Sequence, residues 1–354
     1  MQRLFRRAVR LGCVLLCLVT AAVSFWQWAG ERGEEALLFA AGLKIDREAG
    51  SAAEDFYDAP QETPSHRTLT ADDGIAVFHE DELPRAQVTP EPGRGWGEVE
   101  EIELSGGEQI GDFFVKDTTG SGTDLNYELT QAPAASLKGD GSVEVLIYHT
   151  HTSEAYSKSY TGFYYTDMQT RTSDPDMSVV AAGEALKKTL ESYGIGVVHD
   201  TTLCDELFNG SYSRSWEILQ SSLEKYPGIQ VTIDLHRDSM TTQEGVKYKP
   251  TAVINGRKAA QFMLLAGCNA NGDWEDFPGW EQNLRLMLRV QQKATELYPD
   301  LARPLSFSNS KYNMNATPGS MLIEVGTEVN TVSEATYSGR LLGEILAETF
   351  DSLN

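Results

Sequence analysis

The hydrophobic and polar residues of this chain follow a regular pattern only from Val143 onward. Short apolar runs alternate there with longer segments whose apolar residues recur every three or four positions. The first pattern is typical of buried strands and the second of amphipathic helices. The predicted strands are Val143–Tyr148, Gly196–His199, Gln230–Leu235, Ala259–Gly267 and Ser320–Val325. The predicted helices are Ser178–Tyr193, Ser215–Lys225, Trp280–Leu297 and Glu334–Leu353.

The alternation of strands and helices predicts the fold class of residues 143–354. Two strands joined through a helix form a right-handed unit, and successive units build a mostly parallel sheet. We therefore expect an α/β domain with a mostly parallel sheet and helices on both faces. In such sheets, a functional site lies beyond the carboxyl ends of the strands.

The preceding residues are less regular, and we divide them at residue 98. Residues 31–98 are rich in acidic residues, proline and threonine, and predict an extended acidic linker that begins with a short helix. Residues 99–142 contain short alternating pieces, which predict a small β-rich segment or strands added to the main sheet. Those pieces are Val99–Leu104, Phe113–Lys116 and Leu125–Leu129, and Ala132–Ser142 is interpreted as a second linker.

The first 30 residues combine a basic tip with an uncharged apolar stretch. Four arginines precede Leu11–Trp26, which carries no charge. This arrangement predicts a single transmembrane anchor in the cell membrane, with the rest of the chain on the extracytoplasmic side. A cleaved signal peptide is the alternative, but Phe25 and Trp26 continue the apolar stretch beyond the small residues that would mark a cleavage site.

Charge and cysteine content argue against two classes of function. The chain has 29 Lys and Arg residues against 52 Asp and Glu residues, which gives a net charge of −23. So acidic a surface repels phosphate backbones, and nucleic acid is therefore not expected as a partner. Cys204 and Cys268 lie too far apart in the sequence for a thiolate zinc knuckle. We expect both to be free, buried thiols, with a disulfide between them as the alternative.

Ionisable residues gather where three of the predicted strands end. Two histidines and a glutamate follow the first strand, a histidine and an arginine follow the third, and a glutamate lies near the end of the last. These residues are His149, His151, Glu154, His236, Arg237 and Glu324. Because the carboxyl ends of parallel strands meet at one edge of a sheet, we expect the side chains to lie close together.

This set of residues suits a catalytic zinc ion. His151, Glu154 and His236 supply nitrogen and oxygen ligands, and three protein ligands leave a fourth position for water. Zinc lowers the pKa of that water and polarises a carbonyl group. A further carboxylate must then accept the proton and pass it to the leaving amine. Glu324 is the candidate, because burial at the end of an apolar strand would raise its pKa toward neutrality.

The same residues also have structural interpretations. A His-x-His pair at a strand end often serves the structure alone. His236-Arg237-Asp238 matches the HRD triplet of protein kinases, but no glycine-rich loop with a strand lysine and no DFG accompanies it. Asp234 precedes His236 by two residues and therefore points to the same face of the strand. We expect Asp234 to orient an imidazole.

Three motifs in this order make the chain resemble the stage II sporulation protein P family over residues 143–353. They are VLIYHTHTSEAY, VTIDLHRDS and IEVGTEVNT, with NGRKAAQFMLLAGCNANG between the last two. The resemblance implies a peptidoglycan hydrolase of forespore engulfment, with N-acetylmuramoyl-L-alanine amidase activity and endopeptidase activity on peptide cross-links. It also implies stage II sporulation proteins D and M as partners.

The domain is similar in turn to zinc-dependent cell-wall amidases of the AmiC-like class. Laying their motifs along this sequence implies that His151 and His236 bind zinc and that Glu324 is the catalytic carboxylate. The implied role of Arg237 is to bind a substrate carboxylate or the developing oxyanion. His149 would then lie behind the ligands or exchange roles with His151.

The third ligand departs from the amidase pattern. In those enzymes it is a glutamate at the start of the following helix, where this sequence has Asp174 and Asp176. We expect Glu154 to take the role because its longer side chain reaches more easily to a zinc ion beside His151. Asp176 or Asp174 is the alternative ligand.

Two other functions stay open on the sequence alone. A zinc carboxypeptidase or endopeptidase could use the same ligands, and its products would distinguish it from an amidase. A non-catalytic scaffold that binds the cell wall for the engulfment machinery is the second alternative. The presence of every candidate ligand argues against the scaffold.

Overall fold

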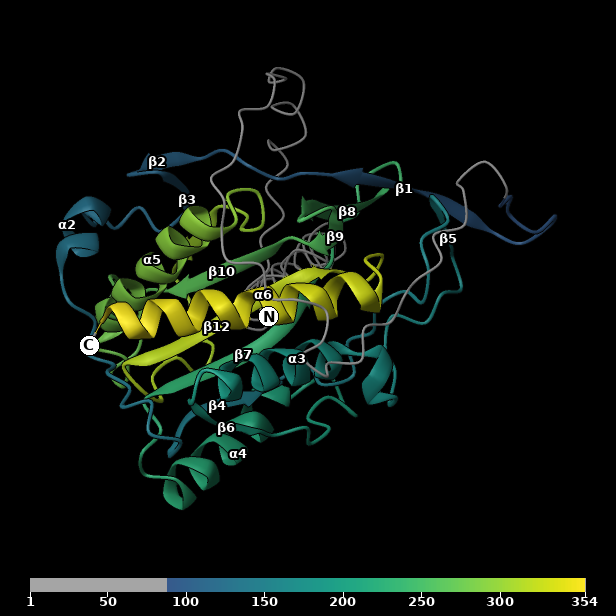
Figure 1. Ribbon diagram of the computed structural model, residues 1–354. Helices are drawn as coiled ribbons and strands as arrows, with labels where there is room; N and C mark the ends of the chain where they lie inside the picture. Colours follow the sequence, from purple (N-terminus) through teal and green to yellow (C-terminus); the bar gives the residue numbers. More distant parts are fainter. Residues whose placement is uncertain (1–87, 354) are drawn as a thin grey trace, which may run out of the picture. The chain divides into compact units, whose positions relative to one another are not determined.

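The computed structural model describes residues 88–353, and the main sheet accounts for most of its core. Among these residues the main sheet has eight strands in the order β2-β3-β11-β10-β12-β7-β4-β6 (Figure 1). Their bounds are Glu108–Ile110, Phe113–Asp117, Leu305–Ser308, Phe262–Gly267, Gly319–Thr327, Val231–Asp238, Val143–Tyr148 and Gly196–His199 in that order. Five of the seven neighbouring pairs are parallel. The prediction of a mostly parallel α/β sheet is confirmed.

Helices cover both faces of this sheet, also as expected. On one face α6 lies between α3 and α5, as Figure 1 shows. On the other face α4 packs against β4, where Leu146 and Tyr148 contact Leu219. The helices are α3 (Val179–Ser192), α4 (Ser211–Lys225), α5 (Trp280–Leu297) and α6 (Val332–Ser352).

Alternation along the central strands separates two environments. Val145 and Ile147 of β4 belong to the large apolar core beneath α3, together with Ile233 of β7. Leu146 and Tyr148 point to the opposite face, toward α4. A residue's position in the strand therefore decides whether it meets the core or the α4 face.

A second, four-stranded sheet has the order β5-β1-β8-β9. Its strands are Phe163–Tyr165, Trp96–Ile102, Lys247–Ile254 and Arg257–Ala260. The predicted strand Ala259–Gly267 is thus divided between two sheets. The division falls at Gln261, whose side chain accepts from Leu104 N and donates to the carbonyl oxygens of Leu104 and Asp300.

The segment 99–142 differs from the sequence prediction in two places. Leu125–Leu129 was expected as a strand but lies in helix α2 (Leu125–Thr130), where Asp124 caps the first turn by accepting from Tyr127 N. Ala132–Ser142 has no regular structure, yet it is not a free linker, because Ala135 and Leu137 are buried in the core. β2 and β3 join the main sheet, which agrees with the expectation that strands of this segment are added to that sheet.

The predicted anchor at residues 1–30 and the linker up to residue 87 lie outside the described residues. Within residues 88–353, no helix is both long and apolar enough to cross a membrane.

Candidate metal centre

Three parallel strands, β4, β7 and β12, bring the candidate residues to one edge of the main sheet. Asp234 of β7 pairs in register with Tyr148, which faces α4, so Asp234 and His236 face α4 as well. β7 runs on through Asp238, beyond its predicted end, and His236 is therefore held within the strand. Glu324 of β12 pairs in register with His236 and shares this face.

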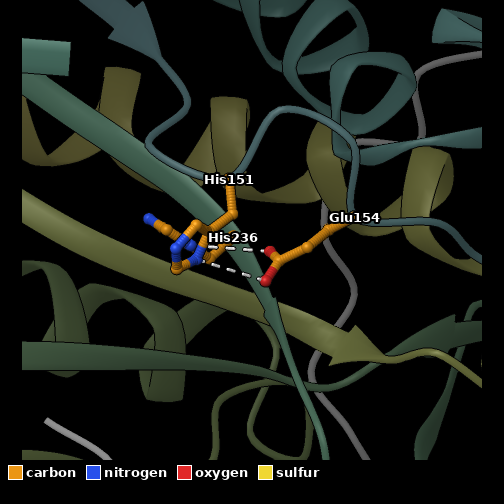
Figure 2. Close-up of side chains that lie close together, drawn as sticks. All are labelled: His151, Glu154 and His236. Atoms are coloured by element: carbon orange, nitrogen blue, oxygen red, sulfur yellow. Dashed lines mark ion pairs between the residues drawn. The ribbon is translucent and has the colours of Figure 1, made fainter. Parts of the chain in front are cut away.

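His151, Glu154 and His236 form a buried group whose ligand atoms all lie within 4.8 Å of one another. The Nδ1 atom of His151 is 3.5 Å from Oε1 of Glu154, and the Nδ1 atom of His236 is 3.5 Å from Oε2 (Figure 2). After β4 the chain turns, and Glu154 N donates to the carbonyl oxygen of His151 at 3.2 Å. This turn brings residues 151 and 154 toward β7.

The two separations between Glu154 and the histidines fit a tetrahedral zinc ion. Nitrogen and oxygen ligands bind zinc at about 2.0–2.1 Å, which places neighbouring ligand atoms about 3.3 Å apart in a tetrahedron. The two observed separations of 3.5 Å are close to that value and longer than a normal charge-assisted hydrogen bond. Two imidazoles and one carboxylate are also a ligand set of known catalytic zinc sites.

The buried carboxylates around this group favour the binding of a cation. Burial alone would raise the pKa of Glu154, but the neighbouring imidazoles of His151 and His236 hold that pKa well below its usual range. Burial alone would lower the pKa of His236, but Asp234 and Glu154 raise it well above its usual range. The buried carboxylates thus stabilise a positive charge at this point, and a metal ion bound there would take the place of the imidazole proton.

Asp234 contacts the far side of His236, as expected for a residue that orients the imidazole. Its Oδ1 atom lies 2.9 Å from Nε2 of His236, at ion-pair distance, although the angle is poor for a hydrogen bond. The carboxylate also accepts from Thr150 N at 2.8 Å and from Thr150 Oγ1 at 2.6 Å. The two hydrogen bonds from Thr150 therefore hold the Asp234 carboxylate in place beside His236.

Glu324 lies beside the group with one oxygen unpaired. Its side chain is buried, and within residues 88–353 its Oε2 atom has no hydrogen-bond partner. Burial raises the pKa of Glu324 to about 8, although His236 opposes the shift. A carboxylate in this position can hold or release a proton near neutral pH.

His149 lies on the other face, away from this group. Its Nδ1 atom is 2.7 Å from the carbonyl oxygen of Leu235, and its Nε2 atom is 2.8 Å from Nε2 of His199. Burial lowers the pKa of His149 to about 3. Both ring nitrogens are engaged, so the structure does not support the alternative in which His149 exchanges roles with His151.

Asp174 and Asp176 also lie outside the group. Both are exposed at a short 3-10 helix (Pro175–Met177), where Asp174 accepts from the backbone N–H of Asp176. Neither aspartate therefore lies where it could share an ion with His151 and His236, whereas Glu154 does.

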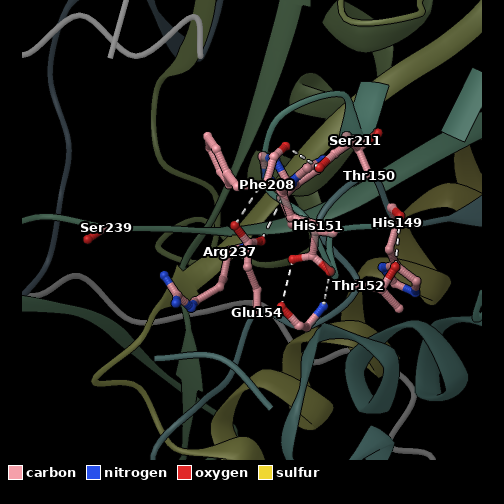
Figure 3. Close-up of polar contacts among 12 residues, drawn as sticks. His149, Thr150, His151, Thr152, Glu154, Phe208, Ser211, Arg237 and Ser239 are labelled. Atoms are coloured by element: carbon pink, nitrogen blue, oxygen red, sulfur yellow. Dashed lines mark hydrogen bonds and ion pairs between the residues drawn. The ribbon is translucent and has the colours of Figure 1, made fainter. Parts of the chain in front are cut away.

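Arg237 points away from the candidate metal centre, contrary to its implied role (Figure 3). Its guanidinium donates to the carbonyl oxygens of Ala155, Thr170 and Asp238, and lies 3.6 Å from a carboxylate oxygen of Glu328. Its neighbours in the strand face α4, so the alternation turns Arg237 to the opposite side. Only its backbone N–H reaches the centre, by donating to Oε2 of Glu154 at 3.1 Å.

Two aromatic residues beside the centre were not predicted. The ring of Phe208 stacks on His151, with centroids 4.9 Å apart, and Tyr212 meets His151 edge-on at 5.9 Å. Phe208 lies in the loop before α4 and Tyr212 in its first turn. No motif in the sequence marks them, although two adjacent apolar residues, Leu207 and Phe208, in a polar loop are unusual. The expectation of free, buried Cys204 and Cys268 is confirmed.

The described residues thus form an α/β domain with a buried His-Glu-His group at one edge of its main sheet. Residues 98–347 match the model of the family described as stage II sporulation protein P. The chain therefore belongs to the stage II sporulation protein P family. A relative with that name from Bacillus subtilis (strain 168) is 26% identical over 237 residues, which cover 62% of this chain and 53% of the relative. The chain thus spans about half the length of that relative.

Solved structures that match this chain include three amidases. The CwlD amidase from Clostridioides difficile, in complex with the GerS lipoprotein, has a TM-score of 0.36 and 15% identity, and covers 60% of this chain and 100% of its own. The N-acetylmuramoyl-L-alanine amidase AmiC2 of Nostoc punctiforme has a TM-score of 0.35 and 11% identity, and covers 60% and 97%. An N-acetylmuramoyl-L-alanine amidase from Clostridium difficile 630 has a TM-score of 0.35 and 16% identity, and covers 60% and 96%.

Proposed function

We propose that this chain is a zinc-dependent peptidoglycan hydrolase that acts in forespore engulfment. The reaction we assign is that of an N-acetylmuramoyl-L-alanine amidase, which cuts the amide between the glycan and the stem peptide. The observation that carries the proposal is the buried group of His151, Glu154 and His236 beside Glu324, in a chain of the stage II sporulation protein P family.

In this proposal the three residues of the group hold the zinc ion, and Asp234 keeps the ring of His236 in place. Bound zinc supplies Lewis acidity, which polarises the scissile carbonyl and activates water near neutral pH. Glu324 accepts a proton from the attacking water at its free oxygen and delivers it to the nitrogen of the leaving L-alanine. The register pairing of Glu324 with His236 keeps the proton carrier next to the ligands.

The setting of the enzyme is proposed from the sequence and the family. We propose that residues 1–30 anchor the chain in the cell membrane and that the hydrolase domain faces the extracytoplasmic side. We propose stage II sporulation proteins D and M as partners, and endopeptidase activity on peptide cross-links as a second reaction of the same centre.

Product analysis of digested peptidoglycan tests the proposal. The full chain is incubated with purified peptidoglycan, with and without a zinc chelator, and new ends are identified by mass spectrometry. We expect stem peptides with free L-alanine amino termini, and we expect the chelator to abolish them. Cleavage confined to cross-links would replace the amidase assignment with a peptidase. Zinc binding without any cleavage, even with protein D present, would favour the wall-binding scaffold.

A further inference from the structure

The two histidines of the metal-binding group are held in place in different ways. His236 has a carboxylate, Asp234, at 2.9 Å on the side away from Glu154. His151 has one polar contact, with Glu154, and within residues 88–353 no hydrogen bond reaches its Nε2 atom. A histidine that binds a metal ion almost always has its second nitrogen fixed by a carboxylate, a carbonyl oxygen or water. His151 therefore needs another means of orientation.

Aromatic rings surround His151 instead. Phe208 lies nearly parallel to the imidazole, with an interplanar angle of 17° and centroids 4.9 Å apart. Tyr212 and His236 meet the ring edge-on, at interplanar angles of 75° and 89°. The parallel ring of Phe208 on one side and the edge-on rings of Tyr212 and His236 restrict rotation of the imidazole about its χ2 bond. Of these rings, Phe208 alone makes face-to-face contact.

The loop that carries Phe208 is fastened to the segment that carries the ligands. Asp205 accepts from Ser153 N at 3.0 Å and from Ser153 Oγ at 2.6 Å, and it pairs with Arg171. The guanidinium of Arg171 also lies 5.3 Å from the centre of the Phe208 ring. Cys204 N donates to Thr152 Oγ1 at 3.1 Å. Because Ser153 and Thr152 lie between the two ligands of this segment, Phe208 is held at a fixed place relative to His151.

We propose that Phe208 is a positioning residue of the metal centre, whose ring holds the imidazole of His151 with Nδ1 directed at the bound ion. The proposal rests on the zinc site of the proposed function, but not on the reaction catalysed there. A side chain that only completed the apolar core would be buried, whereas Phe208 is 47% exposed. Its burial therefore contributes less to folding than that of a core phenylalanine.

Zinc affinity of the full chain and three variants tests this role. The zinc dissociation constant is measured by competition with a chromophoric chelator, together with the unfolding temperature of each zinc-free chain. We expect Phe208→Ala to weaken zinc binding about tenfold or more, the effect known for partners that orient metal ligands. Phe208→Tyr keeps the stacked ring and should restore most of the zinc affinity of the natural chain.

Leu207→Ala is the matched control, because Leu207 is the preceding residue of the same loop and is 72% exposed. It should leave zinc affinity unchanged. Equal affinity in Phe208→Ala and the natural chain would overturn the proposal, and so would equal weakening in Leu207→Ala. A purely structural role would lower the zinc-free unfolding temperature of Phe208→Ala, which we expect to stay unchanged. If the natural chain binds no zinc, both proposals are overturned. If the zinc affinities are as expected but the chain hydrolyses no peptidoglycan, only the proposed function is overturned.

Discussion

At the scale of single residues, Glu324 is the clearest sign of chemistry in the structure. A buried carboxylate without a hydrogen bond to one of its oxygens costs free energy of folding. The side chain is only 6% exposed, and its Oε2 atom has no partner among residues 88–353. This cost is explained if the free oxygen accepts or donates a proton during the proposed reaction.

We expect Glu324→Gln to abolish turnover and to leave the zinc site intact. Removing a general base typically lowers the rate about 10²–10⁴-fold. Because glutamine has the same shape and carries no charge to bury, the free energy of unfolding should stay equal or rise. Initial rates of stem-peptide release and zinc content per chain measure both effects. Full turnover in Glu324→Gln would show that another residue moves the proton.

Arg237 differs from Glu324, because its guanidinium stabilises the fold and does not face the metal centre. It holds three backbone carbonyls and faces the buried Glu328. Removing one partner of a buried charged cluster leaves the other uncompensated, so Arg237→Ala should lower the free energy of unfolding by about 3–5 kcal/mol. Urea unfolding of the full chain measures this. Unchanged stability together with weaker substrate binding would restore the interpretation of Arg237 as a substrate-binding residue.

At the scale of elements, most strands and helices after Val143 were predictable because they have a clear period and a clear end. The helix Leu125–Thr130 was missed because a leucine at positions 125 and 129 also fits a short alternating piece. Four strands were not predicted at all: β2 at Glu108–Ile110, β5 at Phe163–Tyr165, β8 at Lys247–Ile254 and β11 at Leu305–Ser308. β8 contains Pro250, which argues against a strand, and β11 has only four residues.

The site was predictable to the extent that strand ends meet at one edge of the sheet. The choice between His149 and His151 depended on where β4 ends. Had the strand continued, both would point to the same face. The chain instead turns after Tyr148, and this turn carries His151 to the face of His236. Phe208 could not be predicted, because its contact with His151 depends on a loop with no period.

The packing of α3 against α6 gives a prediction at this scale. A Cβ atom on Gly339 of α6 would lie 2.3 Å from the carbonyl oxygen of Ala182 in α3. Gly→Ala in a helix ordinarily stabilises by up to about 1 kcal/mol, but overpacking against backbone costs about 1–3 kcal/mol. We therefore expect Gly339→Ala to destabilise the chain in urea unfolding, whereas Glu348→Ala, at an exposed position of the same helix, should be nearly neutral. Stabilisation by Gly339→Ala would contradict the close contact of the two helices.

At the scale of the described domain, buried histidines link stability to pH. Burial lowers the pKa of His149 to about 3, and it lowers that of His199 as well. Each histidine therefore binds a proton more readily in the unfolded chain, and protonation favours unfolding. The stability that neutral histidines provide is present above the unfolded pKa of about 6.5 and is lost as the pH falls from there toward 3.

Urea unfolding at a series of pH values between about 7 and about 5 checks this dependence. Each titrating histidine should contribute a slope of about 1.4 kcal/mol per pH unit. The slope should become smaller in His149→Gln, which has no proton to bind. A free energy of unfolding that is constant across this range would show that these histidines are accessible to protons in the folded chain.

The central claim is that His151, Glu154 and His236 hold one zinc ion, and zinc content tests it most directly. The full chain and its variants are stripped with chelator, reloaded with zinc and dialysed, and metal per chain is determined by atomic emission. We predict one zinc ion in the natural chain and in Asp176→Ala, and none in Glu154→Ala or His236→Ala. Zinc that persists in Glu154→Ala but is lost in Asp176→Ala would contradict the account and move the third ligand to the exposed turn.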